Sequence, residues 1–174
     1  MQEVAVFRLF AAYNRLVNER LYAVCATMPD ALRKQARGAF FRSVHGTLNH
    51  LLLADRLWLG RFLDTPFEVQ ALSQELYADF NQLRQERAVT DEAIISLVSN
   101  LQPAELVRPL NYMSLARQAP VSLPIGLALT HFFNHQTHHR GQLTTLLSQL
   151  GYDYGDIDMI YMPGAKTGFF PIRP

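Results

Sequence analysis

Four of the six histidines of this chain lie between positions 131 and 139, in a segment whose apolar residues repeat with a helical period. They are His131, His135, His138 and His139. Residues four apart lie on one face of an α-helix, so His135 and His139 can bind one metal ion together. An open divalent site needs a third protein ligand from another segment, for which His50 and His45 are the remaining histidines. This requirement favours a fold in which helices pack side by side.

Apolar residues at steps of three and four predict four long helices. We expect them at residues 7–24, 43–63, 73–101 and 124–151. Ser43 is suited to capping the second helix, Pro124 to the first turn of the fourth, and Gly151 to its end. The third helix starts at Ser73 in this interpretation, although Thr90 would equally start a separate helix.

The connections between these helices are long enough to shape the topology. Residues 31–42 read as a connection with a helical turn, and residues 107–123 as an irregular excursion or a short hairpin. The predicted fold is an all-α four-helix bundle in which a long connection forms a crossover. We expect one domain over residues 1–174, with the C-terminal tail packed on the helices.

Composition narrows the possible functions. The 174 residues are 49% apolar, enough for one core, and the net charge of +1 offers no basic stripe for nucleic acid. Cys25 is the single cysteine, so no internal disulfide forms, which favours the cytoplasm. The N-terminal segment carries Glu3, Arg8 and Arg15 and does not resemble a signal peptide. We therefore expect a cytoplasmic protein that binds neither nucleic acid nor a membrane.

Two separated motifs resemble those of a known family. One is GTLNHLLLADRLW at residues 46–58, and the other is HFFNHQTHHRGQ at residues 131–142. Together with Tyr13 and Asn14 near the start and Gly155 to Asp158 in the tail, they closely resemble the DinB-like family of bacterial four-helix metalloproteins. The resemblance spans nearly the whole chain.

The resemblance implies an up-down-down-up bundle and a metal site. Carried over to this sequence, the family's three metal ligands are His50, His135 and His139. The implied metal is one divalent transition ion, zinc or nickel foremost, with iron as a further candidate. The resemblance also implies a homodimer and a low-molecular-weight thiol or another small molecule as substrate.

The other histidines have simpler interpretations. His138 lies about 100° from His139 around the helix, so it is expected to support the site rather than share the ion. His131 shares a face with His135 and forms an alternative pair. His45 is expected at the surface or at the start of the second helix.

Further polar residues near these motifs are candidates for supporting roles. Asp55 is expected to orient a ligand or to hold the helices together, and Trp58 to pack. Gln142 is one turn beyond His139 and is expected to support it. Arg61 and Arg140 are candidates for attracting an anionic substrate, with solvent exposure as the simpler alternative.

Two metal chemistries are disfavoured by the residues present. A metalloprotease helix carries a glutamate directly after its first histidine, whereas Gln136 follows His135. Diiron bundles need a glutamate three residues before a histidine, and no histidine here has one. Two hypotheses remain: an enzyme with a three-histidine site, such as a thiol-dependent transferase or isomerase, and a non-catalytic stress-response protein whose metal stabilises a dimer.

Overall fold

The computed structural model describes residues 3–161 of the chain. Its helices are α1 (Glu3–Ala26), α2 (Asp30–Lys34), α3 (Val44–Phe62), α4 (Phe80–Asn100) and α5 (Ile125–Gln149). Two short 3₁₀ helices, η1 and η2, cover Pro103–Glu105 and Met159–Tyr161. Strands β1 (Pro109–Ser114) and β2 (Ala119–Pro124) pair antiparallel as one hairpin. The described chain is therefore mostly helical, as predicted, and the small sheet is an addition to the all-α class.

The helix ends follow local capping chemistry. Ser43 caps α3, since its side chain accepts a hydrogen bond from the Gly46 amide at 3.0 Å. Asp79 caps α4 in the same way through the Gln82 amide at 2.8 Å. The predicted start at Ser73 is therefore wrong, and α4 continues unbroken through Thr90. Gly151 ends α5 with a φ of +78°, as its sequence position indicates.

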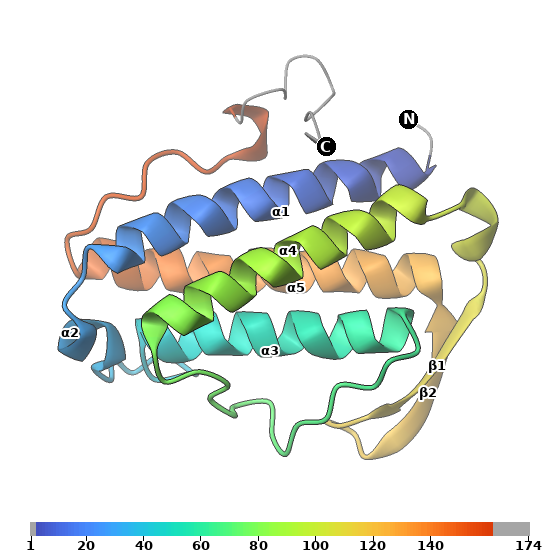
Figure 1. Cartoon of the computed structure of the whole chain (residues 1–174), viewed down its shortest axis with the longest axis horizontal. Helices are drawn as coiled ribbons and strands as arrows, with labels where there is room; N and C mark the ends of the chain where they lie inside the picture. Colours follow the sequence, from blue (N-terminus) through green and yellow to red (C-terminus); the bar gives the residue numbers. More distant parts are fainter. Residues whose placement is uncertain (1–2, 162–174) are drawn as a thin grey trace.

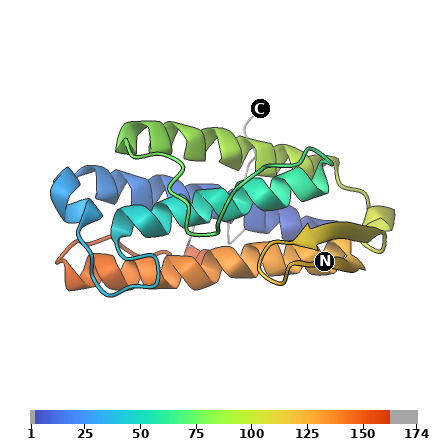
Figure 2. The ribbon, with the colours of Figure 1, turned by 90° about the horizontal axis from the view of Figure 1, so that it is seen from below.

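The four long helices lie side by side, with α1 against α4 and α5, and α3 against α4 and α5. In Figure 1, α1 and α5 run in one direction and α3 and α4 in the other. Because α3 and α4 run the same way, residues 63–79 cross back along the length of α3, which both Figure 1 and Figure 2 show. The crossing segment contacts α3 through the Leu72 carbonyl oxygen, which lies 2.9 Å from Nδ1 of His50.

The apolar core has two halves separated by a polar layer. One half gathers Leu21, Leu48 and Leu147 with their neighbours, and the other gathers Phe7, Ile94 and Phe132 with theirs. Between the halves, every long helix contributes buried polar side chains. They are Asn14 and Asn18 of α1, His50 and Asp55 of α3, Arg87 and Asp91 of α4, and Gln136, His139 and Arg140 of α5.

The hairpin covers one end of α3 and α5, at the right of Figure 1. Leu110 is buried among the second core half, and the Tyr112 ring meets the Trp58 ring edge-on with centroids 5.4 Å apart. The hairpin reading of residues 107–123 is thus confirmed. No helix among residues 3–161 combines the length and the apolar character needed to cross a membrane.

The chain after α5 returns along α1. The Tyr13 hydroxyl donates to the Ile157 carbonyl at 2.9 Å, and the Arg20 guanidinium donates to the Asp156 carbonyl. Figure 1 shows this segment, in red, running beside α1. Residues 152–157 are therefore held against the helices, while residues 162–174 of the expected tail lie outside the described residues.

Candidate metal centre

Three histidines converge between α3 and α5. The Nε2 atom of His139 lies 3.2 Å from Nε2 of His50 and 3.1 Å from Nε2 of His135. One ring nitrogen from each residue falls within 4.8 Å of the other two. The helix spacing that places His135 and His139 on one face and the packing of α3 against α5 together produce this convergence.

The protein fixes which nitrogen of two of these rings carries the proton. Nδ1 of His50 lies 2.9 Å from the Leu72 carbonyl oxygen, which can only accept, so Nδ1 donates. Nδ1 of His139 donates in the same way to Oε1 of Gln142 at 2.9 Å. Both neutral rings therefore direct an unprotonated Nε2 into the cluster, where two lone pairs face each other at 3.2 Å. Such lone pairs repel unless a cation lies between them.

The cluster fits a divalent transition metal by this chemistry. Zinc–imidazole bonds are about 2.0–2.1 Å long, so ligand nitrogens at angles of about 90–110° are roughly 2.8–3.4 Å apart. The two short Nε2–Nε2 distances, 3.1 and 3.2 Å, match that range. Histidines whose outer nitrogens donate to a carbonyl or an amide oxygen are also typical of metal sites. The residues present therefore suit the ion that the sequence motifs imply.

Neighbouring segments hold His50 in place. The Phe41 ring stacks on the His50 ring with centroids 3.6 Å apart. Phe41 can approach because position 46 is glycine: a Cβ atom on Gly46 would collide with the Phe41 carbonyl oxygen. On the other side, Oδ1 of Asn49 accepts from the amides of Leu76 and Tyr77 at 2.9 and 3.0 Å. This pins the crossing segment that supplies the Leu72 carbonyl.

Burial keeps the three imidazoles neutral. Loss of solvent lowers the pKa of His50 to about 4, and burial with the neighbouring His139 and His50 rings lowers the pKa of His135 to about 3. Burial also lowers the pKa of His139. Neutral imidazole is the form that binds metal, so at neutral pH the cluster needs no deprotonation before an ion enters.

The model of the DinB family matches residues 1–167. The chain belongs to the DinB family. Protein DinB of Bacillus subtilis (strain 168) is 26% identical over 173 residues, in an alignment that covers 92% of this chain and 95% of that protein. A crystal structure of a DinB-like protein from Bacillus cereus ATCC 10987 has a TM-score of 0.58 and 17% identity, covering 80% of this chain and 89% of that one. That likeness concerns the fold, and the family resemblance of the sequence is confirmed.

The other histidines of this DinB-family chain lie outside the cluster of three. His138 is exposed, and its Nε2 accepts from the Gln142 amide at 3.2 Å, so it supports the amide that orients His139. The ring of His131 lies 5.9 Å from that of His135, centroid to centroid, and packs near Trp58. His45 is buried at the second position of α3 and contacts the Tyr77 carbonyl at 2.9 Å. Its expected surface location is wrong and the expected helix start is right.

Gln136 and Asp55 belong to a different polar cluster. The Gln136 amide donates to Oδ1 of Asp55, and Oδ2 of Asp55 accepts from Arg87 at 2.7 Å. Arg87 also pairs with Asp91 at 2.9 Å. The Gln136 side chain therefore contacts Asp55 and not the three histidines, and Asp55 holds helices together rather than orienting a metal ligand. Arg140 is 3% exposed and donates to Asn14, which removes it as a substrate contact.

Cys25 and Trp58 are both buried and have structural rather than chemical roles. Cys25 is fully buried, and burial raises the pKa of its thiol to about 12, so it does not act as a nucleophile at neutral pH. Trp58 is buried and stacks with Phe62 at a centroid distance of 5.8 Å, in agreement with the expected packing role.

Several contributors to the site escape sequence analysis. The Leu72 carbonyl is a backbone group on a loop, so no side-chain pattern indicates it. Phe41 lies in a connection with no periodicity. Arg87 and Asp91, in contrast, lie on the apolar stripe of α4 between Leu83 and Ile94, and charges on a core-facing stripe are a detectable sign of a buried pair.

Open space adjoins the histidines on two sides. A cavity of about 540 Å³ is lined by His50, His135 and His131, and it extends along α3 and α5 beneath the hairpin. We call this the seam cavity. A second cavity of about 730 Å³ includes all three clustered histidines and Phe41 in its wall. The site is therefore reachable by a small molecule.

Proposed function

We propose that this DinB-family protein is a divalent-metal-dependent enzyme that acts on a small molecule, with His50, His135 and His139 as the metal ligands. The observation that carries the proposal is the convergence of one ring nitrogen from each of these three histidines, with the Nε2 atoms of His50 and His139 3.2 Å apart beside open cavities. Zinc and nickel are the favoured ions, with iron as a third candidate.

Three protein ligands leave coordination positions open, as in catalytic metal sites. A divalent ion bound there would act as a Lewis acid that lowers the pKa of a thiol or of water. Around it, His50 and His139 keep their lone pairs directed inward through Leu72 and Gln142. Phe41 covers one face of the His50 ring and limits access of water from that side. We propose a thiol-dependent transferase or isomerase as the reaction class.

Metal analysis after purification without added metal tests the first part. We expect about one divalent ion per chain in the wild type, with loss in His139→Ala. A screen that pairs low-molecular-weight thiols with electrophilic co-substrates tests the second part. Consumption of the electrophile only with the metal-loaded wild type supports the proposal, and metal binding without turnover of any pair contradicts the reaction class.

The alternative is a non-catalytic, metal-stabilised dimeric stress-response protein. It draws on the fact that His50 belongs to α3 and the other two histidines to α5, so one ion would tie two helices together. Exchange of an added thiol at the metal separates the two functions, since a structural ion is normally closed by four protein ligands.

The proposal extends to the whole protein. We propose that residues 1–174 form one domain, an up-down-down-up four-helix bundle with a crossover between α3 and α4. We also propose that it is a cytoplasmic homodimer. Light scattering of the metal-loaded protein tests the dimer, for which a mass near twice the 19.8 kDa of the chain is expected.

A further inference from the structure

The seam cavity joins the histidines to a cationic side chain on the same helix face. Arg61 follows His50 by eleven residues on α3, which is about three turns and about 16 Å of rise. Ala54 and Leu57 fill the turns between them, and all four residues line the cavity. Side chains on a helix lean toward its N-terminus, so the Arg61 side chain is directed back toward His50.

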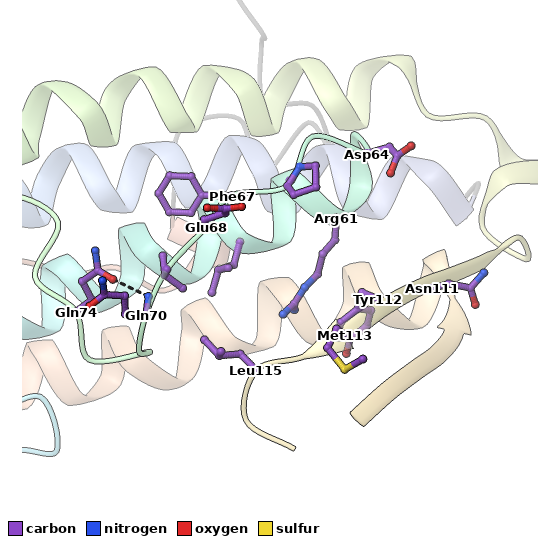
Figure 3. Close-up of a pocket in the computed structure, with 14 residues that line it drawn as sticks. Arg61, Asp64, Phe67, Glu68, Gln70, Gln74, Asn111, Tyr112, Met113 and Leu115 are labelled. Atoms are coloured by element: carbon purple, nitrogen blue, oxygen red, sulfur yellow. Dashed lines mark hydrogen bonds between the residues drawn. The ribbon is translucent and has the colours of Figure 1, made fainter. Parts of the chain in front are cut away.

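Arg61 is held in place without an anionic partner. Its guanidinium carbon lies 4.5 Å from the centre of the Trp58 ring and 4.1 Å from that of Tyr112. Within residues 3–161, no carboxylate lies within 4.0 Å of its nitrogens and no acceptor hydrogen-bonds to them. Figure 3 shows the nearby Asp64 carboxylate pointing away from it.

Each of the other arginines with a buried or half-buried side chain has a carboxylate or an amide oxygen as its partner. Arg15 pairs with Glu19 and Glu92, Arg33 with Asp30, Arg56 with Glu86, and Arg87 with Asp55 and Asp91, while Arg140 donates to the Asn14 side-chain oxygen. Arg61 is half-buried and lines both the seam cavity and a neighbouring cavity of about 780 Å³, whose wall also includes Asp64 and Glu68. Two aromatic faces order the guanidinium, and its donors stay available to a ligand.

The lining of the seam cavity has one sign of charge. Arg61 and Arg117 both contribute to its wall, and none of its lining residues in the described chain is acidic. The rest of the wall is largely apolar, with Leu57, Val121 and Leu127 among its members. A cavity with cationic groups and apolar walls suits an anionic ligand with a hydrocarbon portion.

We propose that Arg61 is a substrate-binding residue that selects small molecules carrying a carboxylate or a similar anionic group. In this arrangement, which rests on the proposed function, the metal-binding end of the ligand lies at the histidines and its anionic end at the Arg61 guanidinium. The apolar stretch between them lies along Ala54 and Leu57. A bidentate guanidinium–carboxylate contact gives both orientation and affinity.

The test uses the cobalt(II)-loaded full-length protein and two matched sets of probes. The probes are ω-mercaptocarboxylates of increasing chain length and the primary amides of the same acids. Thiol binding is followed by the thiolate-to-cobalt charge-transfer absorption. For the best chain length we expect the acid to bind about 10- to 100-fold more tightly than its amide, the range for one hydrogen-bonded charge pair.

The variants assign this preference to one side chain. Arg61→Gln should bind acid and amide within about twofold of each other, and Arg61→Lys should keep an intermediate preference. Arg108→Gln is the matched control, because Arg108 is exposed, pairs with Glu105 and does not line the seam cavity. It should retain the full wild-type preference.

The outcomes separate this inference from the proposed function. If thiols bind to cobalt in the wild type but acids and amides bind equally, the role of Arg61 is overturned and the metal site stands. An acid preference that survives in Arg61→Gln also overturns it. If no cobalt binds, or no thiol reaches the cobalt, the proposed function fails and the inference falls with it. The wild-type comparison alone is decisive if a variant does not fold.

Discussion

Two polar clusters lie in the same layer between the two apolar halves of the core, and they are completed differently. In the Asp55 cluster, Asp55 contacts Arg87 and Gln136, and Asp91 contacts Arg87 and Asn18, so protein groups pair the charges. Nε of Arg87 and Oε1 of Gln136 have no hydrogen-bond partner among the described residues. In the histidine cluster, the outer nitrogens of His50 and His139 have partners but the inner ones face each other.

The difference separates a structural role from a binding role within one layer. Buried charges are tolerated when hydrogen bonds and ion pairs compensate for lost solvation, and the Asp55 cluster achieves this with side chains from all four long helices. The histidine cluster is held from outside by Leu72, Gln142 and Phe41, its three ring nitrogens converge, and it borders open cavities. Converging, oriented donor nitrogens beside open space are what a ligand site requires.

The largest effect should come from disrupting the Asp55 cluster. Asp55→Ala leaves Arg87 without one of its two carboxylates in a site where Asp55 is 1% exposed. Removing one partner of a buried ion pair costs about 3–5 kcal/mol of unfolding free energy. Urea denaturation of the metal-free protein measures this loss. Metal stoichiometry of the folded fraction should stay at the wild-type level.

Asp55→Asn is the matched control for this prediction, because it keeps the size and one acceptor oxygen. It should cost less than Asp55→Ala and bind the full amount of metal. A variant that stays folded but loses its metal would show that the two clusters are not independent.

Disrupting the histidine cluster should reduce stability by a smaller amount, and only when metal is bound. His50→Ala removes the only α3 member of the three clustered histidines, so metal no longer links α3 to α5. At a free metal concentration roughly a hundred times the dissociation constant, the lost stabilisation is about 2.7 kcal/mol. The melting temperature should fall accordingly.

A chelator provides the second half of this experiment. Chelator should lower the melting temperature of the wild type by a similar amount and have little further effect on His50→Ala, because both changes remove one interaction. Full metal content and wild-type melting in His50→Ala would mean that His50 is an ordinary core histidine.

Within α5, neighbouring histidines should differ sharply in their effect on metal content. His135→Ala and His139→Ala each remove one of the converging nitrogens and should lose most of the bound metal. His138→Ala removes a contact to the Gln142 amide and an edge-on contact to the His139 ring, but no converging nitrogen, so it should keep the stoichiometry, with a weaker affinity at most. Metal analysis after dialysis measures all three, and equal losses would refute the ligand assignment.

Features of the fold that depend on neighbouring residues in the sequence are predictable from it, and features that depend on tertiary contacts are not. The helical spacing of His135 and His139, the Ser43 cap and the Gly151 stop are local patterns, and the structure has each of them. The start of α4 differs from the predicted one because Ser73 and Asp79 are both good caps, and the hydrogen bonds of Asn49 to the crossing segment favour Asp79. Such tertiary contacts override local preference.

The site shows the same division. The family motifs indicate the three histidines. The contacts of His50 with the Leu72 carbonyl and the Phe41 ring depend on how segments distant in sequence pack beside α3, so the motifs do not indicate them. The partner-free state of Arg61 is likewise a property of its surroundings, since its sequence neighbour Asp64 does not pair with it.

The smallest expected effect is a difference in the sign of pH dependence between the two clusters in the metal-free protein. The pKa of His50 is about 4 in the folded state and 6.5 without burial, so below pH 6.5 the unfolded chain binds a proton that the folded chain does not. His50 therefore lowers stability on acidification from pH 6.5 toward 4. Burial raises the pKa of Asp55 from 3.8 to about 6, so this carboxyl raises stability over the interval from pH 6 to 3.8.

Urea midpoints of the metal-free wild type, His50→Ala and Asp55→Asn between pH 7 and about 4.5 measure the two contributions by difference. Relative to the wild type, His50→Ala should lose less stability as the pH falls, because the group that opposes folding at low pH is gone. Asp55→Asn should lose more, because the group that favours folding at low pH is gone. If both variants change the pH dependence of the urea midpoint in the same direction, burial does not shift the pKa values of His50 and Asp55 in opposite directions, and the prediction is wrong.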